Sequence, residues 1–262
     1  MNIGYVDTLA AQNTVLHRLD PRAKLIVTLV YSVTVISFPH YSLSGLIPFF
    51  IYPALMIPLA NIPFWYIVKR IGTVLPFALL IGVFNPVFDT TVKMQIGPLA
   101  VSGGWLSFIS LVMRVVLTVS AVMILIATTG MYRMCMAMEK LGIPNVFAVQ
   151  LLFVYRYLFV LIEEATRMAR ARALRSFSRG GLSISAFTSI TGNLLIRTID
   201  RAQRIHLAML ARGFDGTIRL VSRGRFGLVD LLYVCAVCGV IVLLRVYNIA
   251  SIVGNILTGP GQ

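Results

Sequence analysis

The chain has 262 residues, of which 58% are hydrophobic and 12% are charged, and its mean hydropathy is +0.87. This composition excludes an ordinary soluble domain and predicts an integral membrane protein. The formal net charge of +14 is concentrated in residues 130–226, which hold 15 of the 23 Lys and Arg but only five acidic residues. Basic residues accumulate on the cytoplasmic side of membranes, so we expect this segment to be cytoplasmic. Its basic residues alternate with apolar ones, which argues against a nucleic-acid-binding module.

The N-terminal residues 1–24 are mixed and polar, so no cleaved signal peptide is predicted. Asp20 and Pro21 have the order of a helix start, because Asp can cap free amides and Pro fits the first helical position. Arg22 and Lys24 follow immediately and are basic. We therefore expect a multi-pass protein of the inner (cytoplasmic) membrane with its N-terminus in the cytoplasm.

Apolar stretches of bilayer length, about 20 residues, predict five transmembrane helices, over 25–41, 43–60, 71–88, 105–129 and 227–250. Lys69 and Arg70 would then lie at the cytoplasmic side after two spans, and residues 89–104 would lie outside. Glycine and proline at 97–98 and glycines at 103–104 predict a small external turn or hairpin over Lys93 to Gly104.

A sixth apolar stretch, 145–162, contains Gln150 and Arg156 and is followed by two glutamates. If it crossed the bilayer, the arginine cluster at 167–179 would lie outside, against the charge rule. We therefore predict an amphipathic helix that lies along the membrane or against other helices. Its apolar positions recur at helical spacing, and they are Phe147, Leu151, Val154, Leu158, Ile162 and Ala165.

A second amphipathic helix is predicted after Gly180-Gly181, with Ser183 as its cap and Gly213 as its stop. Its apolar stripe is Phe187, Ile190, Leu194, Leu195, Thr198, Ala202, Ile205 and Met209. The pair should form a helical hairpin or a cross. The predicted organisation is an all-α membrane protein with a membrane domain of four spans (1–129), a cytoplasmic region (130–226) of two or three amphipathic helices, and a last span with its tail (227–262).

Three segments of the chain resemble the transmembrane T component of energy-coupling factor (ECF) transporters, the CbiQ/EcfT family, over nearly the whole chain. They are the opening Leu19-Asp20-Pro21-Arg22-Ala23-Lys24-Leu25, the middle Leu141-Gly142-Ile143-Pro144 with Tyr155-Arg156-Tyr157-Leu158 and Glu163-Glu164-Ala165, and the closing Ala208-Met209-Leu210-Ala211-Arg212-Gly213-Phe214. The Tyr-Arg-Tyr segment and Phe84-Asn85-Pro86 are more similar to the cobalt and nickel branch than to the general vitamin branch.

The resemblance implies a scaffold that holds a substrate-binding membrane subunit, CbiM-like if the cargo is cobalt, and two ABC-type ATPase subunits. In that family two coupling helices each end in an Ala-Arg-Gly-like triplet whose arginine docks in one ATPase. Ala211-Arg212-Gly213 matches the second triplet without change. Leu174-Arg175-Ser176 has the family's spacing for the first, although Arg172 between two alanines also resembles the motif.

Arginine suits such a docking role because its planar fork binds a carboxylate or several carbonyls at once, whereas lysine offers a point charge. A C-terminal position adds a favourable interaction with the helix dipole. The competing interpretation is that basic residues at cytoplasmic helix ends reflect only topology and contact with anionic membrane lipids. We expect most of the basic residues of 130–226 to serve the second purpose.

An enzymatic role is disfavoured, because the spans lack concerted nucleophiles or carboxylate pairs and a phosphate-binding Gly-Lys-Ser/Thr loop is absent. We predict no catalytic residues, no metal site and no cofactor in this chain, with ATP and Mg²⁺ used by partner subunits. Cys135, Cys235 and Cys238 are interpreted as small packing residues. Arg114 lies within a predicted span, either at a helix interface or reaching the external surface. The alternatives are a general vitamin T component and a self-sufficient secondary transporter.

Overall fold

The computed structural model describes residues 8–12, 14–39, 43–88, 92–96, 99–175, 184–216 and 226–246. It is helical apart from one two-stranded hairpin, so the predicted all-α membrane fold is confirmed. The chain divides into two compact units, Met1–Ala137 with Gly224–Gln262, and Met138–Arg223. Below they are called the membrane unit and the coupling unit. The first limit, after Ala137, lies eight residues beyond the predicted 129, and the second, after Arg223, lies three residues before the predicted 226. The placement of the predicted segments across a membrane stays a prediction.

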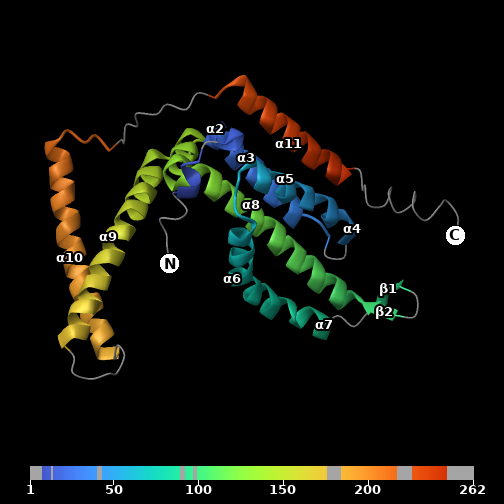
Figure 1. The fold of residues 1–262 in the computed structure, drawn as a ribbon, viewed down its shortest axis with the longest axis horizontal. Helices are drawn as coiled ribbons and strands as arrows, with labels where there is room; N and C mark the ends of the chain where they lie inside the picture. The colour runs from blue at the N-terminus through green and yellow to red at the C-terminus, as the bar shows by residue number, and fades with distance from the viewer. Residues whose placement is uncertain are drawn as a thin grey trace. The chain divides into compact units, whose positions relative to one another are not determined.

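The described part of the membrane unit is built from short helices, from the longer helices α6, α8 and α11, and from the hairpin (Figure 1). In chain order they are α2 (Val15–Arg18), α3 (Pro21–Ile36), α4 (Leu43–Leu46), η1 (Ile47–Phe50), α5 (Ile51–Leu59), α6 (Phe64–Gly82), α7 (Phe84–Phe88), β1 (Val92–Ile96), β2 (Leu99–Ser102), α8 (Gly103–Lys140, whose last residues enter the coupling unit) and α11 (Leu228–Val246). The antiparallel β1–β2 pair confirms the predicted hairpin.

Two of the predicted spans differ from the helices that form. The stretch 43–60 forms α4, η1 and α5 in direct succession, so Leu43–Leu59 is one apolar helix with a 3₁₀ turn in its middle. Proline removes a backbone donor and clashes with the preceding turn, and Pro48 lies in this 3₁₀ turn. The stretch 71–88 begins seven residues too late, since α6 starts at Phe64 and includes Lys69 and Arg70. The guanidinium of Arg70 lies 5.6 Å from the centre of the Tyr66 ring one turn earlier, so the basic pair is part of the helix.

In the part of the chain that the structure describes, four helices are long and apolar enough to cross a membrane, namely Phe64–Pro86, Gly103–Lys140, Asn145–Arg175 and Leu228–Val246. α3, with 16 residues, and Leu43–Leu59 are shorter than this criterion requires. The third of the four is α9 (Asn145–Arg175), which we predicted not to cross. Its length and composition permit crossing, so the prediction that it lies along the membrane rests on the distribution of charge and on the amphipathic pattern of its residues.

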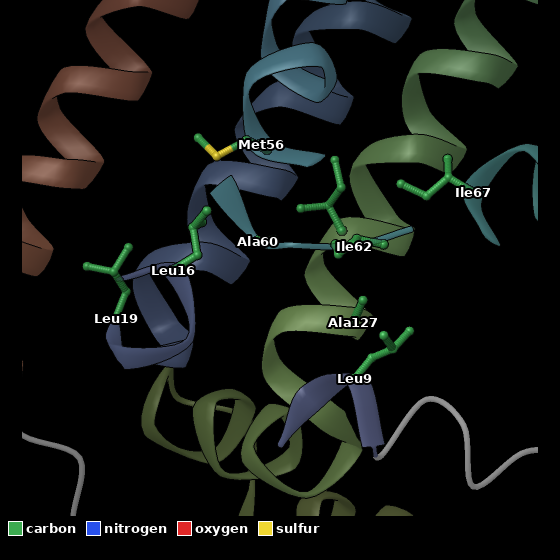
Figure 2. Packing of buried hydrophobic residues seen from close by; sticks show 9 residues of the cluster. Leu9, Leu16, Leu19, Met56, Ala60, Ile62, Ile67 and Ala127 are labelled. Atoms are coloured by element: carbon green, nitrogen blue, oxygen red, sulfur yellow. The ribbon is translucent and has the colours of Figure 1, made fainter. Parts of the chain in front are cut away.

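The core of the membrane unit consists of two clusters of apolar side chains. The first joins the N-terminal segment to the end of α5, to α6 and to α8, and Figure 2 shows most of it: Leu9, Leu16, Leu19, Met56, Ala60, Ile62, Ile67 and Ala127. The second surrounds Tyr31 of α3, which is fully buried and donates its hydroxyl to the Phe49 carbonyl at 2.9 Å. α11 packs along α3 and contributes side chains to both clusters. The two helices run parallel, because hydrogen bonds join their starts and their ends.

The predicted helix start at Asp20 is confirmed. The Asp20 carboxylate accepts the Arg22 amide at 2.9 Å, and Pro21 is the first residue of α3. This bond satisfies one of the amides that the first turn of a helix leaves without an internal partner.

The coupling unit contains α9 and α10 (Ile184–Ala211), which lie side by side and antiparallel (Figure 1). The ring of Phe153, near the start of α9, lies 6.4 Å from the ring of Phe214, just beyond the end of α10. The side-chain amide of Asn145 donates through Nδ2 to the Gly216 carbonyl at 3.5 Å, which ties the same two ends. The predicted helical hairpin is therefore confirmed. The suggested cap, Ser183, lies outside the described residues.

Candidate functional site

The second arginine triplet forms the C-terminal cap of α10. The helix ends at Ala211, and Gly213 follows with φ +76°, the left-handed conformation that glycine adopts without strain. The Phe214 amide donates to the Met209 carbonyl and the Gly213 amide to the Leu210 carbonyl, both at 3.0 Å. These two bonds define a Schellman motif, in which Arg212 occupies the capping position. Gly213 is thus the stop that the sequence predicts.

The cap leaves its arginine accessible. Ala211, Arg212 and Gly213 are all exposed, and no hydrogen bond or ion pair found among the described residues engages the Arg212 guanidinium. A Cβ atom on Gly213 would meet nothing within 4 Å, so glycine is required there for its backbone angle and not for space. The cap can therefore hold Arg212 at a defined point while its charge stays available to a partner.

We expect Gly213→Ala to loosen this cap, because a left-handed φ costs a residue with a Cβ about 1–2 kcal/mol. The amides of Arg212, Gly213 and Phe214 should then exchange hydrogen roughly tenfold faster, as measured by mass spectrometry on the purified chain. Gly192→Ala is the matched control, since Gly192 lies within α10 and a Cβ there also meets nothing within 4 Å. Equal exchange rates in both variants would contradict the role of the Gly213 backbone.

The first triplet lies at the C-terminal end of α9. Arg175 is the last residue of that helix, Leu174 is 83% exposed, and Arg172, one turn earlier, is also exposed. Ser176 lies outside the described residues. Both arginines of this end are therefore accessible, and exposure does not distinguish them.

The two triplets lie at opposite ends of the α9–α10 pair, because the helices are antiparallel. Arg212 follows the end of α10, which lies beside Phe153 near the start of α9, whereas Arg175 ends α9. A helix rises 1.5 Å per residue, so the stretch of α9 from Phe153 to Arg175 is roughly 30 Å long. The two arginines are thus placed to reach two separate binding surfaces rather than one.

One carboxylate ties the middle of the two helices together. Glu164 of α9 accepts from Arg197 of α10 at 3.1 Å and from Arg167 at 2.9 Å, and Arg201 lies 3.9 Å away. Its side chain is 16% exposed, whereas those of the arginines are 41–64% exposed. A network around one shielded carboxylate is worth more than isolated surface pairs. The sequence showed Glu163-Glu164 and the arginines of α10, but their pairing required knowledge of the helix register.

The apolar stripes of α9 and α10 meet in a groove of about 500 Å³ within the coupling unit. Its lining includes Val154 and Leu158 from the predicted stripe of α9, and Ala202, Ile205 and Met209 from that of α10. Sequence periodicity identified these faces correctly, and the structure adds that in part they face each other.

Comparison with known proteins places this geometry in a family. The family model described as “Cobalt transport protein” (CbiQ) matches residues 12–222, most of the chain. The chain belongs to the CbiQ/EcfT family. Among its relatives, an energy-coupling factor transporter transmembrane protein EcfT of Heliobacterium modesticaldum is 28% identical, with 88% of this chain and 92% of the relative covered. The EcfT protein of Leuconostoc gelidum is 28% identical (84% and 87% covered), and an uncharacterized protein of Methanocaldococcus jannaschii is 26% identical (85% of each covered).

Membership of the CbiQ/EcfT family makes the chain a transmembrane component of an ECF transporter, as the sequence motifs predict. The matched region contains both arginine triplets, the Glu164 network and the opening motif at Asp20. The chain is therefore a membrane transport protein, and its long apolar helices are consistent with a membrane environment.

The opening motif of this CbiQ/EcfT protein is bound into a buried polar cluster that sequence reasoning did not find. Lys24 is 3% exposed, and its Nζ donates to the Thr128 carbonyl of α8 at 2.9 Å. The carboxylate of Asp230 in α11 accepts the Asp20 amide at 2.7 Å and the Gly227 amide at 2.9 Å. Asp20, the residue that caps α3, is thereby connected to the first turn of α11.

Burial, together with the nearby Arg133 charge and against the opposing charges of Asp20 and Asp230, lowers the pKa of Lys24 from 10.5 to about 8. Lys24 precedes the apolar stretch 25–41, at the start of α3. Between pH 8 and 10.5 the unfolded chain binds more protons at this residue than the folded chain does. The lysine therefore makes the folded state less stable below pH 8, and this loss is relieved as the pH rises through that window.

We accordingly expect the parent protein to gain stability relative to Lys24→Met as the pH rises from 7.5 to 10. The gain should be about 2 kcal/mol, since each pKa unit corresponds to about 1.4 kcal/mol. Thermal unfolding in detergent, followed by tryptophan fluorescence at both pH values, should show the difference in Tm between the two proteins change by roughly 5 °C in the parent's favour. A difference that does not change with pH would contradict this prediction. Other titrating groups are common to both proteins and cancel.

The structure also describes the surroundings of Arg114 and of the residue types that bind metals. Arg114 donates to the Pro39 carbonyl at 2.7 Å, so it contacts the chain just beyond α3. Within the described part of the chain, no group of three or more His, Cys, Asp or Glu residues comes together as metal ligands would.

Proposed function

We propose that the chain is the energy-coupling scaffold of an ECF-type ABC importer and links a substrate-binding membrane subunit to two ATPase subunits. The observation that carries this proposal is the placement of Arg175 and Arg212 at opposite ends of one antiparallel helix pair. Two separated, exposed and permanently charged side chains suit attachment to two ATPase molecules, one at each end. The Glu164 network supports it, because it braces the two helices so that force applied at either end is transmitted to the pair.

In this proposal the chain performs no catalysis itself. ATP and Mg²⁺ bind to the partner ATPases, and the cargo ligands belong to the substrate-binding subunit. Arg212 and Arg175 are the docking side chains, with Arg172 as the competitor of Arg175. Ala211, Gly213, Leu174 and Ser176 complete the two triplets. The chain lies in the inner (cytoplasmic) membrane, and its N-terminus and coupling unit face the cytoplasm. The distribution of basic residues supports this orientation.

Cobalt is the proposed cargo, with nickel as its closest chemical alternative. The matching family model is described as cobalt transport, and the Tyr155-Arg156-Tyr157 and Phe84-Asn85-Pro86 segments favour the same branch. The relatives named EcfT favour the second candidate, a general T component that serves vitamin-binding subunits.

Affinity purification of the tagged chain from its native host tests the scaffold role. We expect two ATPase subunits and a membrane subunit to copurify, and vesicles containing the complex to take up radiolabelled cobalt only with hydrolysable ATP. Competition with nickel and with vitamins distinguishes the branches. Uptake by the chain alone in ATP-free vesicles would instead establish a secondary transporter and overturn the proposal.

A further inference from the structure

The N-terminal segment and the first turn of α3, residues 8–12 and 14–24, contact two elements of the membrane unit that flank the coupling unit in the sequence. These two elements, called the first and second connections, are residues 128–133 of α8 and residues 227–230 at the start of α11. All of the contacts described below lie within the membrane unit, and they come from residues 8–24.

The first connection is broken at Gly130. This residue has φ +70° and ψ 154°, values outside the helical region, so the hydrogen-bond ladder of α8 is interrupted there. Lys24 donates to the Thr128 carbonyl, two residues before the break. A Cβ on Gly130 would lie 3.0 Å from the Cβ of Ala10, which shows how closely the N-terminal segment approaches the break.

Beyond the break, the same segment is bound a second time. Arg133 donates through its two terminal nitrogens to the carbonyls of His17 at 3.3 Å and Ala10 at 3.2 Å. His17 is itself held, since one ring nitrogen lies 2.6 Å from the Thr14 hydroxyl and the other 3.0 Å from the Leu9 carbonyl. The N-terminal segment is thus bonded to α8 on both sides of Gly130.

The second connection is bonded at the start of α11. Asp230 is 7% exposed. Its carboxylate accepts one hydrogen bond from the Asp20 amide and one from the amide of Gly227, which lies just before the helix. Apolar contacts support the arrangement, because Leu9, Leu16 and Leu19 belong to the same cluster as Ala127 of α8 (Figure 2).

We propose that Lys24, Arg133 and Asp230 are positioning residues that fix the first and second connections to one N-terminal clamp, residues 8–12 and 14–24, so that the two connections move together. Without such a clamp, α8 beyond Gly130 could shift without moving the first turns of α3 and α11. A shared clamp instead passes a displacement of α8 beyond Gly130 to the first turns of α3 and α11. Its role in coupling ATP hydrolysis to transport rests on the proposed function, whereas its mechanical role does not.

Distance measurement between two spin labels tests the clamp without any partner protein. The labels are placed at Tyr132, just beyond the break and 46% exposed, and at Val229, at the start of α11 and 71% exposed. The native cysteines are first replaced by serine. In the full-length protein in lipid nanodiscs, the parent should give one narrow distance distribution. Lys24→Met should broaden the distance distribution about twofold, because α8 beyond Gly130 samples more orientations once the Lys24–Thr128 hydrogen bond is lost.

Lys69→Met is the matched control, because it makes the same change at an exposed lysine of α6 and should leave the distribution narrow. Arg133→Lys provides a milder second variant, which keeps the charge but loses the fork that reaches two carbonyls. It decides the question if Lys24→Met does not accumulate in the membrane. A parent-like distribution in a properly inserted Lys24→Met or Arg133→Lys variant overturns the clamp.

A transport assay separates the clamp from the proposed function. In the purified complex, Arg133→Lys should retain ATP hydrolysis while the cargo moved per ATP falls about threefold, since coupling free energies between sites are modest. A merely destabilised protein would lose both in proportion to its amount. If the parent binds no ATPase, the scaffold proposal fails, yet the spin-label result still supports or overturns the clamp.

Discussion

Arg212→Ala is expected to abolish ATP-driven uptake while the chain still inserts and accumulates at the parent level. The guanidinium is exposed and makes no bond found in the described structure, so its loss should not disturb the fold. Removing one member of a hydrogen-bonded charge pair at an interface costs about 2–5 kcal/mol. ATPase binding should therefore weaken by a factor of about 30 or more, measured by titration of the purified ATPases onto the chain in nanodiscs.

Arg212→Lys should also be impaired, because an ammonium keeps the charge but loses the planar fork. Arg204→Ala is the matched control, since Arg204 is an exposed arginine two turns earlier on α10. We expect it to bind ATPases and to transport as the parent does. If Arg212→Ala assembles and transports normally, Arg212 has no docking role and belongs with the basic residues that set topology.

Arg175→Ala is expected to have the second largest effect, an uptake lower by about tenfold, whereas Arg172→Ala should lower it by less than about threefold. The reason is position relative to the helix end. Arg212 directly follows the last residue of α10 and Arg175 is the last residue of α9, but Arg172 lies one turn inside. A partner that binds the end of each helix therefore contacts Arg175 as it contacts Arg212.

Uptake and ATPase titration on the two single variants decide between these arginines. Arg170→Ala is a suitable control, because Arg170 is exposed on the same helix and belongs to neither candidate triplet. The reverse order of effects would identify Arg172 as the first anchor. Normal transport by both variants would leave α9 without an anchor.

The sequence predicted much of the candidate site because its signals are local. Gly213 marks the end of α10 through its own backbone preference, and Asp20-Pro21 marks the start of α3 through a bond between neighbours. Helical periodicity likewise identified the faces of α9 and α10 that meet in the groove. Each of these predictions depends on a few adjacent residues or on one helix.

Local signals were less informative about the regularity and the limits of the apolar helices. The stretch 43–60 forms an apolar helix over Leu43–Leu59, but a 3₁₀ turn containing Pro48 interrupts its α-helical hydrogen bonding. Lys69 and Arg70 were taken as the limit of a span, although α6 contains them and Arg70 lies over Tyr66. In the first case hydropathy did not reveal the effect of proline on the backbone, and in the second a pair of charges did not mark the end of a helix.

The amino-acid sequence by itself determined that this protein is helical and membrane-bound, that it belongs to the CbiQ/EcfT family and that its helix pair ends in arginines. Only the tertiary structure placed these arginines at opposite ends of the pair and brought Glu164 to Arg197. It alone brought Lys24 to Thr128 and Asp20 to Asp230, residues 104 and 210 positions apart. Local preference specifies where helices begin and end. Contacts between distant residues depend instead on helix register and packing, which no short stretch of sequence specifies.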